Sequence, residues 1–265
     1  ASLTLIWLLS GLITMIAAVS YGELSAMMPN AGGQYVYLKE AYNKLIAFLF
    51  GWSFFAVIQT GTIAAVGVGF SKFAAYLIPS LSDENILLDL GAFQLNAAQI
   101  VSIITIVFLT YLNSRGVKDS KTLQTVLTII KILSLFGLIV FGFILAAKAE
   151  VWDVNWTDVW ETKSYNLDTK QWTPIAGTAL LAGISAAMVG SLFSSDAWNG
   201  VTFIAAELKN PKRNVGLSLF LGTFIVTIIY VLTNLMYLAV IPLEEIATAK
   251  SDRVAVVASQ YTFGE

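Results

Sequence analysis

Long apolar stretches, each close to the length that a helix needs to cross a bilayer, constrain the fold of this chain more than any other feature. One crossing takes about 20 mostly apolar residues, and the 265-residue sequence contains six such stretches. Only 12% of the residues are charged, about half the share found in soluble domains. We therefore predict an all-α, multi-pass membrane protein with a single transmembrane domain. The predicted spans are residues 3–25, 45–77, 97–112, 123–147, 175–208 and 215–241.

The fifth predicted span contains an interruption. Residues 194–196 read Ser-Ser-Asp and separate an apolar helix predicted over 175–193 from one predicted to resume over 201–206. Ser and Asp side chains compete with the helical main chain for hydrogen bonds, so three in succession disfavour a helix. At membrane depth, main chain released from a helix is tolerated only beside protein or a water-filled cavity. An interrupted helix with an acidic residue at the break is typical of the substrate site of a secondary transporter.

The distribution of lysine and arginine predicts the orientation of the chain. The connections after the first, third and fifth spans are basic, whereas the alternate connections are acidic or mixed. Because basic connections face the cytoplasm, the first residue is predicted to lie on the outer face. This start, and the lack of a further span at the end, lead us to expect the middle of a longer protein. The basic residues are Lys39, Lys44, Arg115, Lys118, Lys121, Lys209, Lys212 and Arg213.

Two connections are rich in aromatic residues. Residues 34–42 form a short polar and aromatic segment suited to lying along the inner interface. The outer connection, residues 148–173, contains four tryptophans between Trp152 and Trp172. Because tryptophan is enriched where a protein meets the membrane surface, we expect this connection to be an aromatic loop at the outer interface.

Residue types that are missing exclude several kinds of chemistry. The sequence has no cysteine and no histidine, which excludes disulfides, thiol catalysis, cysteine-ligated zinc and the commonest general base. We therefore predict no catalytic residues, no metal site and no cofactor. The formal net charge is −2 and no block of Lys or Arg stands out, so nothing indicates a nucleic-acid partner.

Lys131 stands in the middle of the fourth predicted span. A charge at the centre of a membrane helix costs about 2.5–3.5 kcal/mol on insertion scales, so this lysine should face protein or be neutral. The nearer helix end is about nine residues, or about 13 Å, away, which is too far for the side chain alone. We favour a fixed amine that occupies a cation site, and a structurally paired lysine is the alternative.

Asp196 is the second charge predicted at membrane depth. It has three candidate roles: the partner of Lys131, a contact for a substrate ammonium, or the cap of the helix that restarts after it. The last turn before an interruption offers free carbonyls to a cation, and the first turn after it offers free N–H groups to a carboxylate. A zwitterionic amino acid presents this pair of charges, so amino acids are the favoured substrate class.

Further candidate substrate contacts flank Asp196. Ser194 and Ser195 precede it, and Trp198 and Asn199 follow it closely. Trp198 would either pack against a neighbouring helix or form the wall or gate of a pocket. Tyr230 lies on a polar stripe of the sixth span, where hydrogen bonding between helices is the alternative interpretation.

Four segments and one lysine carry a resemblance to a known family. They are SYGELSAMMPNAGGQYVYLKEAYNKLIAFLFGW, NSRGVK, SDAWNGVTFIAAELKNPKRN and IIYVLTNLMYL, with Lys131 in its span. Together they resemble the L-type amino acid transporter branch of the amino acid–polyamine–organocation superfamily. The resemblance implies that the six spans match helices two to seven of a twelve-helix transporter with the LeuT-type inverted-repeat fold. Residues 1–265 would then be an incomplete portion, without counterparts of the first helix and of helices eight to twelve.

The resemblance also implies roles for individual residues. Lys131 matches a lysine that substitutes for a sodium ion, Phe193 to Asn199 match the unwound helix, and Tyr230 matches a tyrosine near the pocket. Asp196 stands where family members often have a small residue, which bears on substrate preference. Animal members bind a heavy-chain glycoprotein through a cysteine. A chain without cysteine therefore implies a prokaryotic-type relative in an inner membrane, with no disulfide-linked heavy chain.

The main prediction is sodium-independent amino acid transport, by exchange or uniport, with alternating access around residues 194–199. Polyamine, organic-cation or proton-coupled transport within the same superfamily is the alternative, because Asp196 would favour a cationic substrate. A channel or receptor would need a pore-lining polar ring or a ligand-binding domain, and an enzyme would need a nucleophile with a base or a metal. The sequence offers none of these.

Overall fold

The six predicted spans are confirmed. A computed structural model describes residues 2–91, 94–114, 117–167 and 169–264, without the side chains of residues 117–120 and 251. Arg115 and the Lys118 side chain, which contribute to the predicted orientation, lie outside this description. Within it, six helical segments are long and apolar enough to cross a membrane. They are Ser2–Met27, Lys44–Leu77, Ala97–Ser114, Lys121–Ala146, Gly177–Glu207 and Pro211–Val240.

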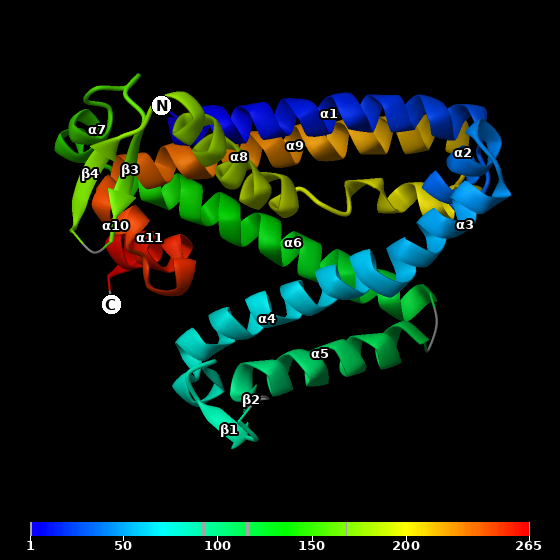
Figure 1. Ribbon diagram of the computed structural model, residues 1–265, viewed down its shortest axis with the longest axis horizontal. Helices are drawn as coiled ribbons and strands as arrows, with labels where there is room; N and C mark the ends of the chain where they lie inside the picture. Colours follow the sequence, from blue (N-terminus) through cyan, green and yellow to red (C-terminus); the bar gives the residue numbers. More distant parts are fainter. Residues whose placement is uncertain (1, 92–93, 115–116, 168, 265) are drawn as a thin grey trace. The chain divides into compact units, whose positions relative to one another are not determined.

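Contacts between residues divide the chain into two compact units. Unit 1 consists of Ala1–Ala47 and Ser134–Glu265, and unit 2 of Phe48–Leu133. Figure 1 labels the elements of both units. The interpretation as a single transmembrane domain stays a prediction, so each unit is described by itself.

Unit 1 is built on α1 (Ser2–Met27) and α9 (Pro211–Val240), which run antiparallel and side by side (Figure 1). The buried face of α1 carries mainly small residues, among them Gly11, Ala18 and Gly22. A side chain at Gly11 would overlap Thr227, and a Cβ at Gly22 would lie 2.9 Å from the Cα of Gly216. In lipid, helices associate through close packing of this kind, since lipid is as apolar as the helix surfaces.

The other elements of unit 1 lie at the ends and sides of this helix pair. The predicted interfacial segment is helical, as α2. The elements are α2 (Gln34–Ala41), the first residues of α3 (Lys44–Ser53), the end of α6 (Val117–Phe141), η3 (Gly142–Ala146), α7 (Ala149–Asn155), β3 (Lys163–Asn166), β4 (Gln171–Pro174), α8 (Gly177–Ser194), η4 (Trp198–Glu207), α10 (Leu243–Ala247), η5 (Lys250–Asp252) and α11 (Val254–Phe263).

The connection over residues 148–173, predicted to lie at the outer interface, contains secondary structure, and its interfacial position stays a prediction. It contains the short helix α7 and an antiparallel hairpin of β3 and β4. Asn155, buried at the end of α7, donates from Nδ2 to the carbonyls of Leu238 and Ile241, both at 2.8 Å. Its Oδ1 accepts from the amide of Leu243 at 3.0 Å. One side chain thus satisfies the main chain where α9 ends.

Unit 2 is a smaller helical assembly. Its helices α4 and α5 pack through small side chains, with Ser71 Oγ 3.4 Å from Ser102 Oγ and Gly67 beside Ser102. A short antiparallel hairpin, β1 with β2, joins the two helices outside the spans. The elements are the end of α3, the π-helix η1 (Phe54–Gln59), α4 (Thr60–Leu77), η2 (Pro79–Leu81), β1 (Ile86–Asp89), β2 (Gln94–Asn96), α5 (Ala97–Ser114) and the first part of α6.

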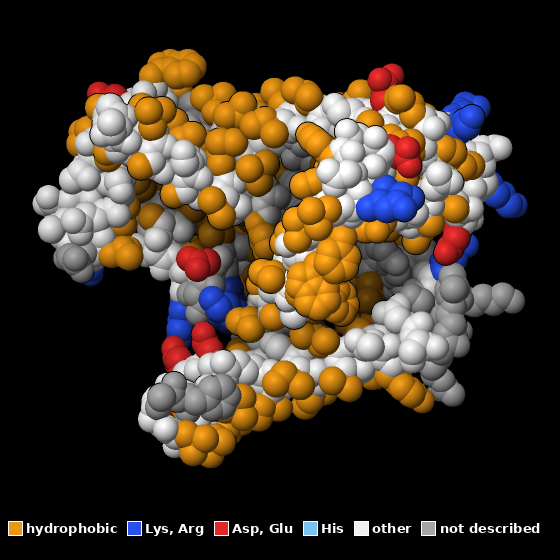
Figure 2. Space-filling model, turned by 45° about the vertical axis from the view of Figure 1, so that its right-hand side comes forward, with side chains coloured by type: hydrophobic (Ala, Val, Ile, Leu, Met, Phe, Trp, Pro, Cys, Tyr) orange, Lys and Arg blue, Asp and Glu red, His pale blue; other side chains and the backbone are white. Residues whose placement is uncertain are grey.

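Charged side chains are sparse along the helices of both units. Figure 2 shows hydrophobic side chains spread widely over the surface and charged side chains in a few small groups. In unit 1, Lys39, Lys209 and Lys212 belong to elements at the end where α1 finishes and α9 begins. Glu150 and Glu244 belong to elements at the opposite end, which agrees with the charge asymmetry of the connections.

Candidate functional site

The predicted interruption of the fifth span is present. The α-helix α8 ends at Ser194, and Ser195 leaves the helical conformation with φ −98° and ψ 4°. Ala197 is left-handed, with φ 66°. The chain then continues as the 3₁₀-helix η4, in which Ile204 is itself non-helical. The helix predicted to resume over residues 201–206 is therefore present, as part of the 3₁₀-helix η4 and not as an α-helix.

The irregular form of η4 has local and long-range causes. Gly200 is a poor helix former, and the Thr202 hydroxyl donates to the carbonyl of Asn199 at 2.7 Å, three residues back. The carbonyl of Phe203 accepts from the amide of Gly32 at 3.0 Å. This hydrogen bond ties η4 to the turn between α1 and α2, so tertiary contacts shape the segment.

At the interruption, both main-chain carbonyls and main-chain amides lack hydrogen-bond partners among the described residues. The hydroxyls of Ser194 and Ser195 donate back to carbonyls of α8, at 2.8 and 3.4 Å. Among the described residues, no hydrogen bond ends on the carbonyls of Ser195 and Asp196, and none starts from the amides of Trp198 and Asn199. Free carbonyls attract a cation and free amides attract an anion. Both kinds lie within five consecutive residues.

Tyr230 lies directly at the interruption. Its hydroxyl donates to the carbonyl of Ser194, the last residue of α8, at 2.7 Å. The ring of Trp7 meets the Tyr230 ring edge-on, with 5.0 Å between the centroids. One turn earlier on α8, the hydroxyls of Ser10 and Ser191 are 2.6 Å apart and buried. Side chains of α1 and α9 therefore hold the end of α8 just before the chain unwinds.

Trp198 lies on the other side of the interruption and packs against α1. Its ring is 5.2 Å from that of Tyr21, in an edge-to-face arrangement, and it contacts the buried cluster that includes Ala18 and Leu219. The Tyr21 hydroxyl accepts from Nε2 of Gln34 at 2.7 Å. Of the two interpretations of Trp198, this contact is packing. A gating role stays a prediction.

Tyr21, Gln34 and Gly33 also lie beside the interrupted span, although the sequence did not indicate them as site residues. A Cβ at Gly33 would lie 2.5 Å from Oγ1 of Thr202, and Gly33 has a φ of 49°. Two adjacent glycines that end an apolar span are a signal for such a close approach. Which segment approaches the glycines depends on the fold, so the sequence does not reveal it.

The remaining predicted residues are placed as follows. Asp196 and Phe193 are exposed, and Asn199 is half-buried. The residue that precedes η4 is Ala197, and no side chain caps this helix, so the prediction that Asp196 caps it is wrong. The left-handed Ala197 turns the chain between Asp196 and the amides that a cap would have to reach. Lys131 is exposed on α6 in unit 2, whereas the interruption belongs to unit 1.

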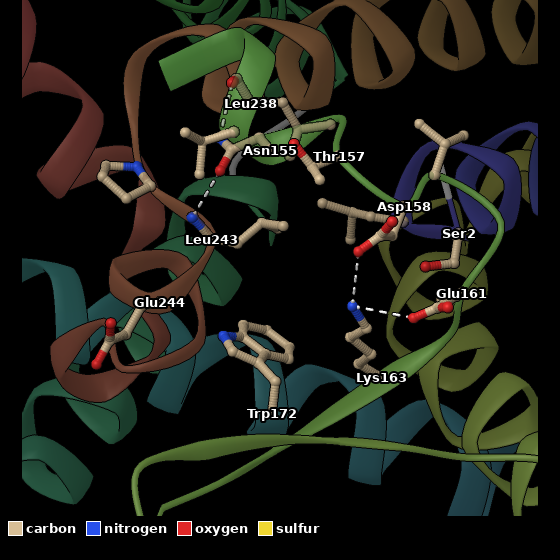
Figure 3. A pocket seen from close by; sticks show the side chains of 14 residues that line it. Ser2, Asn155, Thr157, Asp158, Glu161, Lys163, Trp172, Leu238, Leu243 and Glu244 are labelled. Atoms are coloured by element: carbon tan, nitrogen blue, oxygen red, sulfur yellow. Dashed lines mark hydrogen bonds and ion pairs between the residues drawn. The ribbon is translucent and has the colours of Figure 1, made fainter. Parts of the chain in front are cut away.

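Two described cavities lie away from residues 193–199. The first, of about 430 Å³, is at the outer end of unit 1 and is lined by Asn155, Lys163, Trp172 and Glu244 among others (Figure 3). Its charged groups have partners within the chain. Nζ of Lys163 lies 3.3 Å from Asp158 and 3.1 Å from Glu161. The hydroxyl of Tyr165 donates to Glu244 at 2.8 Å.

These contacts shift two ionisation equilibria. The hydrogen bonds to Glu161 and Asp158 raise the pKa of Lys163, and the hydrogen bond to Glu244 raises the pKa of Tyr165. Since its charges are already satisfied, the outer cavity is less suited to an ionic ligand than the interruption. The second cavity lies between α1 and α9. No group of acidic, histidine or cysteine side chains suited to a metal occurs among the described residues.

Comparison with known proteins identifies the family. The family model described as "Amino acid permease" matches residues 1–264. The chain belongs to the amino acid permease family. This confirms the resemblance seen in the sequence motifs and places the interrupted fifth span within a family of membrane transporters.

Several curated relatives are similar to this permease along 98% of its length. The b(0,+)-type amino acid transporter 1 of Homo sapiens is 28% identical over 285 residues, with 47% of the relative covered. The Asc-type amino acid transporter 1 of Mus musculus is 26% identical, with 44% covered. The large neutral amino acids transporter small subunit 2 of Oryctolagus cuniculus is 28% identical, with 43% covered. The permease spans about half the length of these relatives, which are transporters and not enzymes.

Proposed function

We propose that this chain takes part in amino acid transport, with the substrate bound at the interruption between α8 and η4. The observation that carries the proposal is the pair of free carbonyls at Ser195 and Asp196 next to the free amides of Trp198 and Asn199. A zwitterionic amino acid offers an ammonium to the first pair and a carboxylate to the second. The relatives, all of them amino acid transporters by name, support this substrate class.

The proposed roles of the side chains follow from their positions. The carboxylate of Asp196 adds a negative charge beside the free carbonyls and favours the substrate ammonium. Exposed Phe193 and half-buried Trp198 flank the interruption as apolar walls for the substrate side chain. Tyr230 holds the Ser194 carbonyl, so we assign it the positioning of the unwound segment. The main-chain amide of Asn199 donates to the carboxylate of the substrate.

We further propose a sodium-independent mechanism with alternating access, by exchange or uniport, on a LeuT-type arrangement. The support is Lys131, a lysine in the middle of the apolar stretch of α6. Such a charge supplies what a bound sodium ion would supply elsewhere. Replacing Lys131 with Ala should therefore impair uptake or make it depend on added cations.

One other function has specific support. Asp196 is exposed at the interruption and has no ion pair or hydrogen bond from its side chain among the described residues. An unpaired carboxylate at this place would favour a polyamine or another organic cation, or would carry a proton in a proton-coupled permease.

The proposals on partners and on the type of membrane rest on the absence of cysteine. The name of one relative describes a small subunit, but the present chain has no cysteine, so we propose that it needs no disulfide-linked heavy chain. We propose a multi-pass location in a prokaryotic inner membrane on the same ground. The relatives named above are mammalian and give this origin no support.

Uptake into liposomes tests the proposal. The purified chain is reconstituted, and labelled neutral and cationic amino acids and a polyamine are offered with and without sodium and a pH gradient. We expect amino acid uptake that sodium does not change, and a changed substrate ranking in Asp196→Asn. Asp153→Asn, an exposed acid of the outer helix α7, is the matched control. Uptake of the polyamine alone would favour the alternative, and an unchanged ranking in Asp196→Asn would remove that residue from the site.

A further inference from the structure

The second cavity is an open groove between the end of α1 and the start of α9. It has a volume of about 580 Å³. Its floor contains Gly22 and Gly216, and a Cβ on Gly22 would lie only 2.9 Å from the Cα of Gly216. Because neither glycine projects a side chain, the groove is open between the larger residues on either side.

Polarity changes along the length of the groove. Val19, Leu217 and Phe220 line its part nearer the middle of the spans, and they are 50%, 48% and 41% exposed. Glu23 and Lys212 line its part nearer the helix ends, together with the apolar Ala26 and Met27. Glu23 precedes the last residue of α1 by four positions, or about 6 Å, and Lys212 is the second residue of α9. In a bilayer spanned by α1 and α9, the charged part would lie toward the lipid headgroups and the apolar part toward the hydrocarbon.

The two charges of the groove are opposite in sign and unpaired. Among the described residues, neither Glu23 nor Lys212 takes part in an ion pair or a side-chain hydrogen bond. Lys163, in contrast, has two carboxylates within 3.3 Å. A site with one free carboxylate and one free ammonium at one end of an apolar groove is complementary to a zwitterion attached to a hydrocarbon chain.

We propose that this groove binds a bilayer phospholipid whose headgroup carries a primary amine, as in phosphatidylethanolamine. Lys212 contacts the phosphate, Glu23 accepts hydrogen bonds from the amine, and an acyl chain lies along Val19, Leu217 and Phe220. A primary ammonium has three N–H donors for the carboxylate, whereas the quaternary ammonium of phosphatidylcholine has none. Phosphatidylglycerol has the phosphate but no amine. The site thus distinguishes headgroups by the contact with Glu23.

Native mass spectrometry of the purified chain tests this site. The chain is equilibrated with an equimolar mixture of phosphatidylethanolamine, phosphatidylcholine and phosphatidylglycerol, and the lipids that it retains are counted. We expect preferential retention of phosphatidylethanolamine. Glu23→Gln should lower the preference over phosphatidylcholine about tenfold, as expected for one hydrogen bond to a charged group. Lys212→Gln should weaken retention of all three lipids, since all carry the phosphate.

Matched controls are available on the same side of unit 1. Glu207 and Lys209 are exposed, carry the same charges and do not line the groove, so Glu207→Gln and Lys209→Gln should leave the retained lipids unchanged. Equal retention of the three lipids by the unchanged chain would overturn the proposal. So would equal effects of the control and groove variants. A retained second copy of the chain, released by Phe220→Gln, would show that a helix fills the groove instead.

Discussion

The helix pair α1–α9 and the interrupted span α8–η4 show two ways of placing a long apolar segment in the same unit. α1 and α9 are uninterrupted over 26 and 30 residues and bury residues along their length. α8 buries Ser191 alone. The pair is joined by backbone contact at Gly22 and Gly216, whereas α8 is joined to it by a hydrogen bond between Ser10 and Ser191 and one from Tyr230 to the Ser194 carbonyl.

This difference indicates which part can change conformation at the lower cost. Separating α1 from α9 would open a continuous close-packed interface, and such interfaces adopt discrete arrangements and resist gradual deformation. α8 buries only Ser191 among its described residues and is joined to the pair chiefly by the hydrogen bonds at Ser191 and Ser194, so moving it would break few contacts. η4 is held more firmly, because Thr202 and Ala205 are fully buried and Trp198 packs against Tyr21. We infer that the pair is the frame of unit 1 and that α8 is the part of the interrupted span that moves at the lower cost.

The largest effect is expected from disrupting the frame. In Gly22→Leu, the new side chain would start 2.9 Å from the Cα of Gly216 and would force the helices apart. Overpacking costs typically 1–3 kcal/mol, and here no flexible side chain can move aside, so we expect a loss of about 3 kcal/mol or more. The measurement is thermal unfolding in detergent, followed by circular dichroism.

Gly222→Leu is the matched control for this prediction. Gly222 lies on α9, and a Cβ there would meet no atom within 4 Å, so the change should leave the melting temperature nearly unaltered. Equal melting temperatures for Gly22→Leu and the unchanged chain would mean that α1 and α9 are not a close-packed frame.

The second effect concerns the outer end of the frame. Asn155→Leu would remove three hydrogen bonds and leave the carbonyls of Leu238 and Ile241 and the amide of Leu243 without partners. Water at the outer end can replace part of this loss. We therefore expect destabilisation by about 2 kcal/mol, measured by the same unfolding experiment. Asn214→Leu, which removes one exposed hydrogen bond to Lys209, should cost clearly less. Similar losses for both variants would contradict the special role of Asn155.

Local features of this fold can be predicted from the sequence, whereas pairings between distant residues cannot. The spans follow from length and apolarity, and the interruption follows from Ser-Ser-Asp, because both are properties of consecutive residues. The role of Asn155 depends on a pairing across 83 residues, for which the sequence carries no local signal. The same holds for the contact of Tyr21 with Trp198.

The candidate site shows the same limit. The family resemblance implied that Phe193 to Asn199 match an unwound helix and that Tyr230 lies near the pocket. In the structure Tyr230 donates to the Ser194 carbonyl, and Phe193 and Ser194 are still part of α8, so the chain leaves the α-helix only at Ser195. The sequence did not indicate the left-handed Ala197, which removes Asp196 from the capping position, nor the 3₁₀ form of η4. Both depend on the tertiary contact of η4 with Gly32 and Gly33 in the turn between α1 and α2.

The third effect concerns the attachment of α8 to the frame. Tyr230→Phe removes the hydroxyl that donates to the Ser194 carbonyl but keeps the ring against Trp7. Hydrogen bonds between membrane helices contribute on average about 0.6 kcal/mol, so we expect a small loss of stability. If Tyr230 positions the unwound segment, substrate affinity should fall more than stability. Both are measured on one preparation, by ligand-dependent thermal shift and by unfolding.

Tyr237→Phe is the control for Tyr230→Phe. Tyr237 lies two turns further along α9 and its hydroxyl has no hydrogen bond among the described residues. Its removal should change neither quantity. A loss of affinity in Tyr237→Phe equal to that in Tyr230→Phe would mean that the hydroxyl of Tyr230 has no specific role at the break.

The smallest effect lies at the outer hairpin and depends on pH. The hydrogen bond to Glu244 raises the pKa of Tyr165 above its ordinary value of 10.0. A raised pKa in the folded state means that the contact stabilises the fold below about pH 10 and is lost as the pH rises through the raised pKa. Because this hydrogen bond is exposed to solvent, the interaction is screened and the effect on stability should be slight. The ionisation of Tyr165 itself is the more sensitive readout.

Phenolate absorbance, measured as the difference between a chain with Tyr165 and the same chain with Tyr165→Phe, isolates this ionisation. Glu244→Gln should lower the midpoint of Tyr165 toward its ordinary pKa, since the negative charge is removed and only a neutral, weaker acceptor oxygen remains. Glu245→Gln should leave Tyr165 unchanged and should instead lower the raised pKa of Tyr261, to which Glu245 is bound at 2.8 Å. If Glu244→Gln leaves the midpoint of Tyr165 in place, the hairpin is not bound to α10 in solution. The outer end of the frame would then be held by Asn155 without support from the hairpin.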